Sequence, residues 1–341
     1  MTKRTRIFLF ASAGVLIAGL ATGLVAWASG AAAVGSAGPD ELAYVPGNAR
    51  MVAYADVRQV MNSQLRDRFR QYQRGNPSGP DSLEARTGID FERDVDRVLA
   101  ASIDSNGRLL LPPAAGAGAA GPGRGWSLLI ARGRFDAVRI EGLMQQQGAR
   151  VEQYRGKRLL SIKDESHDAA LAFAEPGLVL FGADAGVRGA LDAKAGAVNA
   201  IGGNREFMAM IDGVAEGTAW SVAKFDSLAG STPIPDAVVN QLPPINWLAA
   251  SGRIDSGVHG LVRAEAQDEQ SAQNLRDVVQ GFLALARLQS TREPAYKGVI
   301  DSVALNADGK SVSLSFDVTP AALDALTSGN AARRPVAPPR P

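Results

Sequence analysis

The chain has 341 residues, with 36 Lys and Arg against 35 Asp and Glu, two histidines and no cysteine. The missing cysteine excludes disulfides, thiolate catalysis and thiolate metal sites. The balanced charge and the 6% aromatic content exclude the basic surface and stacking platform typical of nucleic-acid binding. A chain of this length can bury a sufficient core without disulfides.

The N-terminus carries three cations, Lys3, Arg4 and Arg6, before the charge-free stretch Ile7–Gly38. The apolar core of that stretch, residues 7–27, predicts a helix long enough to cross the ~30 Å hydrocarbon core of a bilayer. The cations would stay on the cytoplasmic side. We therefore expect a membrane partner for residues 7–27 and an inner-membrane protein with a single N-terminal pass. Its C-terminal domain would lie outside the cytoplasm, in the periplasm.

A cleavable signal peptide is the alternative for residues 1–28, because 26–28 and 31–33 each offer an A-x-A-like site. The apolar run is longer than a typical signal core, which favours the uncleaved anchor. Cleavage would release the protein into the periplasm. Residues 29–39 are rich in Ala, Gly and Ser and are expected to form a flexible linker.

Hydrophobic periodicity and turn residues predict a first α+β repeat at 40–204, interrupted by a low-complexity loop at 112–125. The loop has no large apolar group to bury, so we expect it to be dispensable for stability. In chain order we expect a strand at 51–57, a helix that includes Met61 and Leu65, a short helix at 82–87, strands at 98–103 and 127–135, a helix at 136–147, hairpins at 151–162 and 169–182, and a helix at 185–195.

A second repeat at 205–328 follows a similar order, and 329–341 is expected to be a disordered Pro-rich tail. WLAAS at Trp247–Ser251 echoes VLAAS at Val98–Ser102, which suggests an internal duplication of a β-β-α-β-β-type unit. The expected elements are helix 205–214, strands 218–226, 247–251 and 258–266, helix 269–288, and a hairpin of 299–305 with 311–318.

This element order predicts an α+β fold of mostly antiparallel sheets with helices packed on one face. The half-solvated sheet would explain strands such as SVSLSFDV at 311–318, in which Ser and Asp alternate with apolar residues.

Tests for cofactor and metal chemistry are negative. Gly116–Gly121 matches G-x-G-x-x-G, but prolines on both sides prevent the strand and helix that a dinucleotide site needs. His167 with Asp164, Glu165 and Asp168 could form a mixed metal set, although a polar turn is the favoured interpretation. His259 is interpreted as a strand histidine without a ligand role.

Catalytic patterns are also missing. Asp90, Glu92, Asp94 and Asp96 could supply paired carboxylates, but interleaved arginines favour a salt-bridged helix surface. A Ser-His-Asp triad is formally available, yet no serine lies in a G-x-S-x-G elbow. The sequence therefore assigns no catalytic, cofactor-binding or metal residue.

Two segments carry a resemblance to a known family: Glu41–Phe69, and the run from Phe282–Arg287 through Asn306–Phe316. They resemble bacterial exported proteins of unknown function that are common in acidobacterial-type genomes. The resemblance implies an extracytoplasmic α+β protein behind a signal or anchor, and it brings no catalytic residue.

Together these features predict a membrane-tethered extracytoplasmic protein that acts by binding or scaffolding, with a protein or cell-envelope partner, no cofactor and no nucleic acid. One alternative is an extracytoplasmic hydrolase or carbohydrate-active enzyme. Another is a sensory or regulatory ectodomain that works through a membrane partner.

Overall fold

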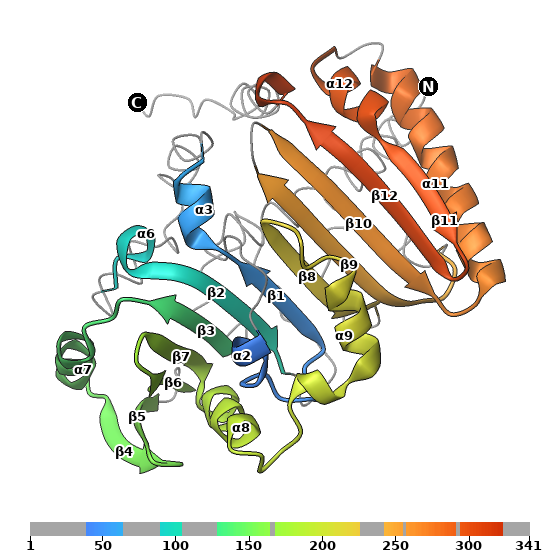
Figure 1. Ribbon diagram of the computed structural model, residues 1–341. Helices are drawn as coiled ribbons and strands as arrows, with labels where there is room; N and C mark the ends of the chain where they lie inside the picture. The colour runs from blue at the N-terminus through green and yellow to red at the C-terminus, as the bar shows by residue number, and fades with distance from the viewer. Residues whose placement is uncertain are drawn as a thin grey trace, which may run out of the picture.

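The computed structural model describes residues 39–63, 89–103, 128–163, 168–225, 242–254, 257–290 and 294–322. Within them, twelve strands form one sheet in which all neighbours are antiparallel (Figure 1). The strands are β1 (Met51–Ala55), β2 (Val95–Ser102), β3 (Leu128–Gly133), β4 (Arg150–Tyr154), β5 (Lys157–Lys163), β6 (Asp168–Glu175), β7 (Leu178–Ala183), β8 (Ala219–Lys224), β9 (Ile245–Ile254), β10 (Val258–Ala266), β11 (Ala304–Asp308) and β12 (Ser311–Val318). Their order across the sheet is β11-β12-β10-β9-β8-β1-β2-β3-β7-β6-β5-β4.

Helices occupy the connections between the strands. They are α2 (Pro39–Leu42), α3 (Val57–Met61), α6 (Phe91–Asp94), α7 (Ala137–Gln146), α8 (Asp184–Lys194), the 3-10 turn η1 (Ile201–Gly203), α9 (Arg205–Asp212), α11 (Glu269–Ser290) and α12 (Pro294–Ser302). Their combination with the antiparallel sheet confirms the α+β class.

Helices cover both faces of the sheet, and the expectation that they all lie on one face is wrong. Along β7, Val179 packs with Ile140 of α7, whereas Leu178 and Leu180 pack with Leu191 of α8. Successive strand residues point to opposite faces, so α7 and α8 lie on opposite sides. The physical reason is that β7 is apolar at consecutive positions, and both of its faces must therefore be buried.

The two halves of the sheet extend outward from the central pair β1–β8, where Ala53 faces Ser221. On one side the order is β1-β2-β3-β7-β6, and on the other it is β8-β9-β10-β12-β11. The first, second and third strands of each half thus have equivalent neighbours and directions. This arrangement agrees with duplication of one unit. The first half contains two additional strands, β4 and β5.

The sequence match of VLAAS at 98–102 with WLAAS at 247–251 is shifted by one residue from the structural equivalence of β2 and β9. Val98 packs with Ile140 under α7, but Trp247 packs with Phe207 of α9 on the opposite face. Leu248 lies on the face that Val98 occupies, as the pairs across β1, β8 and β9 show. A one-residue shift moves a strand side chain to the other face, so the echo reflects composition.

The hairpin turns lie where the sequence placed them. Arg155 and Gly156 both have positive φ, 50° and 73°, as a type I′ turn requires, and Gly309 has φ 53°. The final hairpin is shorter than expected, because 299–302 belong to α12 and the strand begins at Ala304. Val299 packs as a helical residue against Phe316 in the core.

Several expectations fall outside the described residues: the apolar stretch 7–27, the helices expected after residue 63 and at 82–87, the loop 112–125, His167 and the tail. In the part of the chain that the structure describes, no helix has the length and apolar character needed to cross a membrane.

Candidate binding groove

An open groove of about 1310 Å³ lies on the face of the sheet that α2, α8 and α9 cover. One wall is the segment 42–48 that follows α2, and the other is the N-terminal half of α8 at 183–189. The segment 198–204, which includes η1, closes one end, where Ile103 and Met208 also reach it. We call this space the binding groove.

Backbone hydrogen bonds fix the 42–48 wall to the 198–204 segment. The amide of Gly47 donates to the carbonyl of Asn199 at 2.7 Å, and the amide of Ile201 donates to the carbonyl of Val45 at 2.7 Å. Pro46 and Ala200 form an isolated antiparallel bridge between these bonds. The wall is therefore held as rigidly as a short strand pair, although neither segment belongs to the main sheet.

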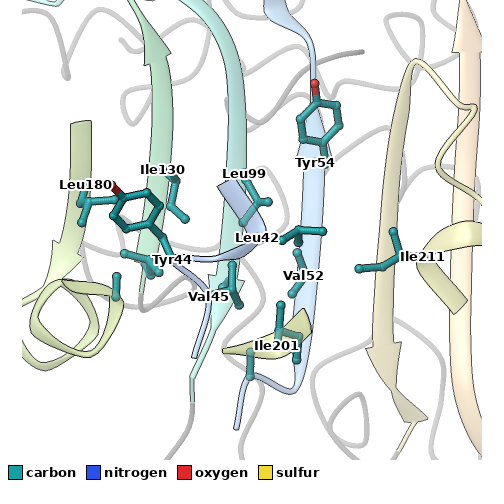
Figure 2. Packing of buried hydrophobic residues seen from close by; sticks show 14 of the residues in the cluster. Leu42, Tyr44, Val45, Val52, Tyr54, Leu99, Ile130, Leu180, Ile201 and Ile211 are labelled. Atoms are coloured by element: carbon teal, nitrogen blue, oxygen red, sulfur yellow. The ribbon is translucent and has the colours of Figure 1, made fainter. Parts of the chain in front are cut away.

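Apolar packing fixes the same wall to the sheet beneath it. Figure 2 shows Leu42, Tyr44 and Val45 directed toward the core. All three are at most 4% exposed. Their neighbours in this cluster include Val52, Leu99, Ile130, Leu180 and Ile201. Burial of this kind is worth about 1.5–3 kcal/mol for each large apolar side chain.

A buried carboxylate joins α2 to two strands. Glu41 is 2% exposed, and its Oε1 accepts from Nε of Arg132 at 2.5 Å. Nη2 of Arg97 lies 3.1 Å from the same oxygen. Since Arg97 and Arg132 are paired neighbours on β2 and β3, the carboxylate bridges two strands at once. A buried charge is tolerated only when it is paired in this way.

A second polar contact joins the 42–48 wall to α8. The Tyr44 hydroxyl donates to Oε1 of Glu175 at 2.8 Å. Nζ of Lys194, the last residue of α8, lies 3.4 Å from that oxygen and 4.9 Å from the centre of the Tyr44 ring. The Tyr44 hydrogen bond, followed by the Lys194 charge, lowers the pKa of Glu175. Burial raises the pKa of Tyr44, which keeps its hydroxyl protonated as a donor.

The side chains that line the groove are mostly small and apolar. Five of its lining residues are glycines (Gly47, Gly186, Gly189, Gly202 and Gly203), and most of the others are Ala, Leu, Ile, Val, Met or Pro. A β-carbon on Gly189 would lie 3.5 Å from Cγ of Pro46, in ordinary contact across the groove. Gly189 thus lies where α8 and the 42–48 wall come close together, and a larger side chain there would enter the space between them.

The described side chains that line the groove carry no charge, so they could bind a ligand without forming ion pairs. Its polar side chains, among the described lining residues, are Asn48, Asn199 and Asn204. Oδ1 of Asn204 already accepts from the amide of Phe207, where it caps α9. No described lining residue is titratable or carries a hydroxyl or thiol, so the groove supplies no nucleophile, acid or base.

Three of the four acidic residues that the sequence offered as paired carboxylates are held by local contacts. Asp90 caps α6 by accepting from the amides of Glu92 and Arg93, and Asp94 accepts from the amide of Asp90 at 2.9 Å. Asp96 pairs with Arg58 of α3. The expected helix surface is wrong beyond Asp94, because β2 begins at Val95. Each of Asp90, Asp94 and Asp96 therefore has a structural partner.

Of the two histidine candidates, the structure describes His259. His259 lies on β10 and pairs through Nδ1 with the carboxylate of Asp317 on the neighbouring strand β12. Among the described residues, no group of three His, Cys, Asp or Glu side chains could hold a metal ion. His167, Asp164 and Glu165 lie outside those residues.

Sequence reasoning missed the groove because small apolar residues and asparagines carry no motif. The acidic pair Asp40–Glu41 at the start of DELAYV is typical of the first turn of a helix, so it gave no sign that Glu41 is buried. Its partners Arg97 and Arg132 are distant in sequence, so the pairing itself leaves no local pattern.

No protein-family model matches the chain, and no curated protein matches it. The chain is similar to crystal forms III and I of the Treponema protein TP0453, each with a TM-score of 0.42, 9% identity, and coverage of 86% of this chain and 99% of that one. Crystal form IV gives a TM-score of 0.39 at 10% identity.

Proposed function

We propose that this protein is a membrane-tethered extracytoplasmic binding protein without catalytic activity, whose groove holds an uncharged, mainly apolar ligand. The observation that carries the proposal is the lining of the groove: glycines, alanines, larger apolar residues and three asparagines. Such a surface binds by shape and burial, with the amides available for a few orienting hydrogen bonds.

The volume of the groove is sufficient for a ligand larger than a drug-sized molecule. Its volume of about 1310 Å³ exceeds the ~300–1,000 Å³ typical of drug-sized pockets. The space is also open to solvent rather than enclosed. Charged ligands are disfavoured, because the lining offers no countercharge to replace their hydration.

The tether supports a location close to the membrane surface. The apolar stretch ends at residue 27 and the groove wall begins at residue 42, so fourteen residues lie between them. A fully extended chain spans ~3.3–3.6 Å per residue, which keeps the groove within about 55 Å of the bilayer. Ligands drawn from or delivered to the envelope would therefore be within reach.

The hydrolase alternative has no support in the described part of the chain. A hydrolytic site needs a nucleophile or paired carboxylates that converge on a cleft. The described acids named above are engaged in caps and ion pairs, and none of them lines the groove.

A groove-filling substitution tests the proposal. Gly189→Leu places a side chain against Pro46, and Gly142→Leu is the matched control, because Gly142 is an α7 glycine with open space on the opposite face. The full chain in lipid nanodiscs would be photolabelled with a short, uncharged alkyl diazirine, and the adducts mapped by peptide mass spectrometry.

We expect adducts on 183–189 and 198–204 in the wild type and in Gly142→Leu, with most of them lost in Gly189→Leu. Equal labelling of these segments in all three proteins would contradict a binding groove between α8 and the 42–48 wall.

A further inference from the structure

β11 is an edge strand with one unused side. Within the described residues it pairs with β12 alone. The two-residue turn Gly309–Lys310 makes Asp308 and Ser311 a hydrogen-bonded pair, so Ala304, Asn306 and Asp308 direct their backbone groups toward β12. The N–H and C=O groups of Leu305 and Ala307 therefore point outward, away from the sheet.

The edge carries one charge, Asp308 at its turn end, and few of the other features that usually block further pairing. Its sequence, ALNAD, contains neither proline nor a basic residue. The opposite edge, β4, carries Arg150 and Glu152, and Glu152 is engaged by Arg188 of α8. Exposed edge strands are commonly protected by charges or proline, and β11 is the less protected of these two edges.

The sequence of β11 is compatible with pairing to itself. In an antiparallel pair centred on Asn306, Leu305 of one copy faces Ala307 of the other. The outward N–H and C=O groups of these residues then form four hydrogen bonds in the alternation that an antiparallel ladder requires. Asp308 faces Ala304 of the second copy, so no like charges meet.

α11 lies beside β11 (Figure 1), and its Leu275 and Val279 pack in one cluster with Leu305 of the strand. A five-residue strand pair buries less than the ~1,200 Å² of a standard interface, so its backbone hydrogen bonds and the high local concentration of tethered copies would stabilise the pairing.

We propose that β11 is a dimerisation edge, which pairs antiparallel with β11 of a second copy of this chain about a two-fold axis at Asn306. The two sheets then continue into one another, and the α11 helices of both copies lie on the same face. Membrane tethering would favour this association by confining the copies to one surface.

The absence of cysteine makes the register directly testable. In the proposed pair, Asn306 faces Asn306 at a non-hydrogen-bonded position, where Cα atoms are ~4.5 Å apart, within the range that a disulfide spans. Under mild oxidation of the full chain in detergent, Asn306→Cys is expected to give a disulfide-linked dimer. Ala304→Cys and Asp308→Cys are each expected to stay unlinked alone and to link when the two are mixed.

These three side chains are exposed, so the substitutions test pairing rather than folding. Linkage of Asn306→Cys together with the mixed pair supports the proposal. No linkage of Asn306→Cys would overturn it, and this is the result expected if the chains associate only through their N-terminal segments. Equal linkage of Ala304→Cys alone would also overturn it.

A proline pair provides an independent measurement. Ala307→Pro removes an outward N–H of β11, and Val151→Pro removes the corresponding outward N–H at the β4 edge. By light scattering of the full chain in detergent, we expect the wild type and Val151→Pro to be dimers and Ala307→Pro to be a monomer. A monomeric wild type, or a dimer that survives Ala307→Pro, would overturn the proposal.

Discussion

Gly260 lies directly opposite Phe316 in the β10–β12 ladder, and the phenyl ring occupies the space where a β-carbon would be. A β-carbon built on Gly260 would lie 1.8 Å from Cζ of that ring. The ring is 7% exposed and packs with Val299 of α12, so the glycine creates the room in which the final helix docks. On its other side Gly260 pairs with Gly252. A β-carbon built on Gly252 would have no neighbouring atom within 4 Å.

This asymmetry predicts opposite outcomes for two paired glycines. Gly260→Ala should lower the free energy of unfolding by about 1–3 kcal/mol, because the ring must move from its packed position. Gly252→Ala should leave stability unchanged or raise it slightly, since alanine restricts the unfolded chain. Chemical denaturation of the two variants measures the difference. Equal effects would contradict the described position of the ring.

The buried carboxylate of Glu41 predicts a large effect from a small change. Glu41→Gln removes the charge that pairs with Arg97 and Arg132, and we expect a loss of about 2–4 kcal/mol in the free energy of unfolding. Glu152→Gln is the control. Its pair with Arg188 is more exposed and should be worth at most about 1 kcal/mol. Similar losses in both variants would show that Glu41 is not buried in an ion pair.

Asp56 predicts a dependence of stability on pH. Burial raises the pKa of Asp56 to about 6. The hydrogen bond from the amide of Gln59 acts in the opposite direction but is the smaller effect. The folded state therefore binds the proton more tightly than the unfolded state does. This group's contribution is most favourable below the unfolded pKa of ~3.9 and is lost as pH rises toward 6.

Asp56→Asn isolates this contribution while it retains a good helix N-cap. Allowing for partial exposure, we expect the variant to be more stable than the wild type at pH 7.5 by at most about 2 kcal/mol. The difference should shrink toward zero as pH falls from 6 to 4. Denaturation curves across that range measure it, and a difference that grows at low pH would contradict the raised pKa.

The N-terminal sequence predicts the location of the full chain. It should fractionate with membranes, resist extraction at alkaline pH, and expose its C-terminal domain to protease from the periplasmic side. A mature N-terminus near Ser29 or Val34, found by sequencing the purified protein, would show that the segment is cleaved and would rule out the anchor.

Local patterns were sufficient to predict most of the elements. Arg155–Gly156 and Asp308–Gly309 placed two hairpins, and Gly148 marked the end of α7, where its φ is 91°. These signals depend on residues that are adjacent in the chain. The α+β class followed from the order of such elements.

Features that depend on distant residues were not predictable in the same way. The sides of the sheet that α7 and α8 cover depend on which β7 residues face each helix. The register of β9 depends on its partners rather than on its similarity to β2. The groove is formed where three separate segments meet. Its glycines and asparagines are residue types that are common in turns, so their presence in the sequence does not indicate a binding site.

Native mass spectrometry of the full chain, released from nanodiscs made from its own host's envelope, tests the central claim most directly. The account predicts that the wild type and Gly142→Leu retain an uncharged, mainly apolar molecule, and that Gly189→Leu does not. A protein that retains no such molecule, or one in which filling the groove leaves retention unchanged, would contradict a binding function for the groove.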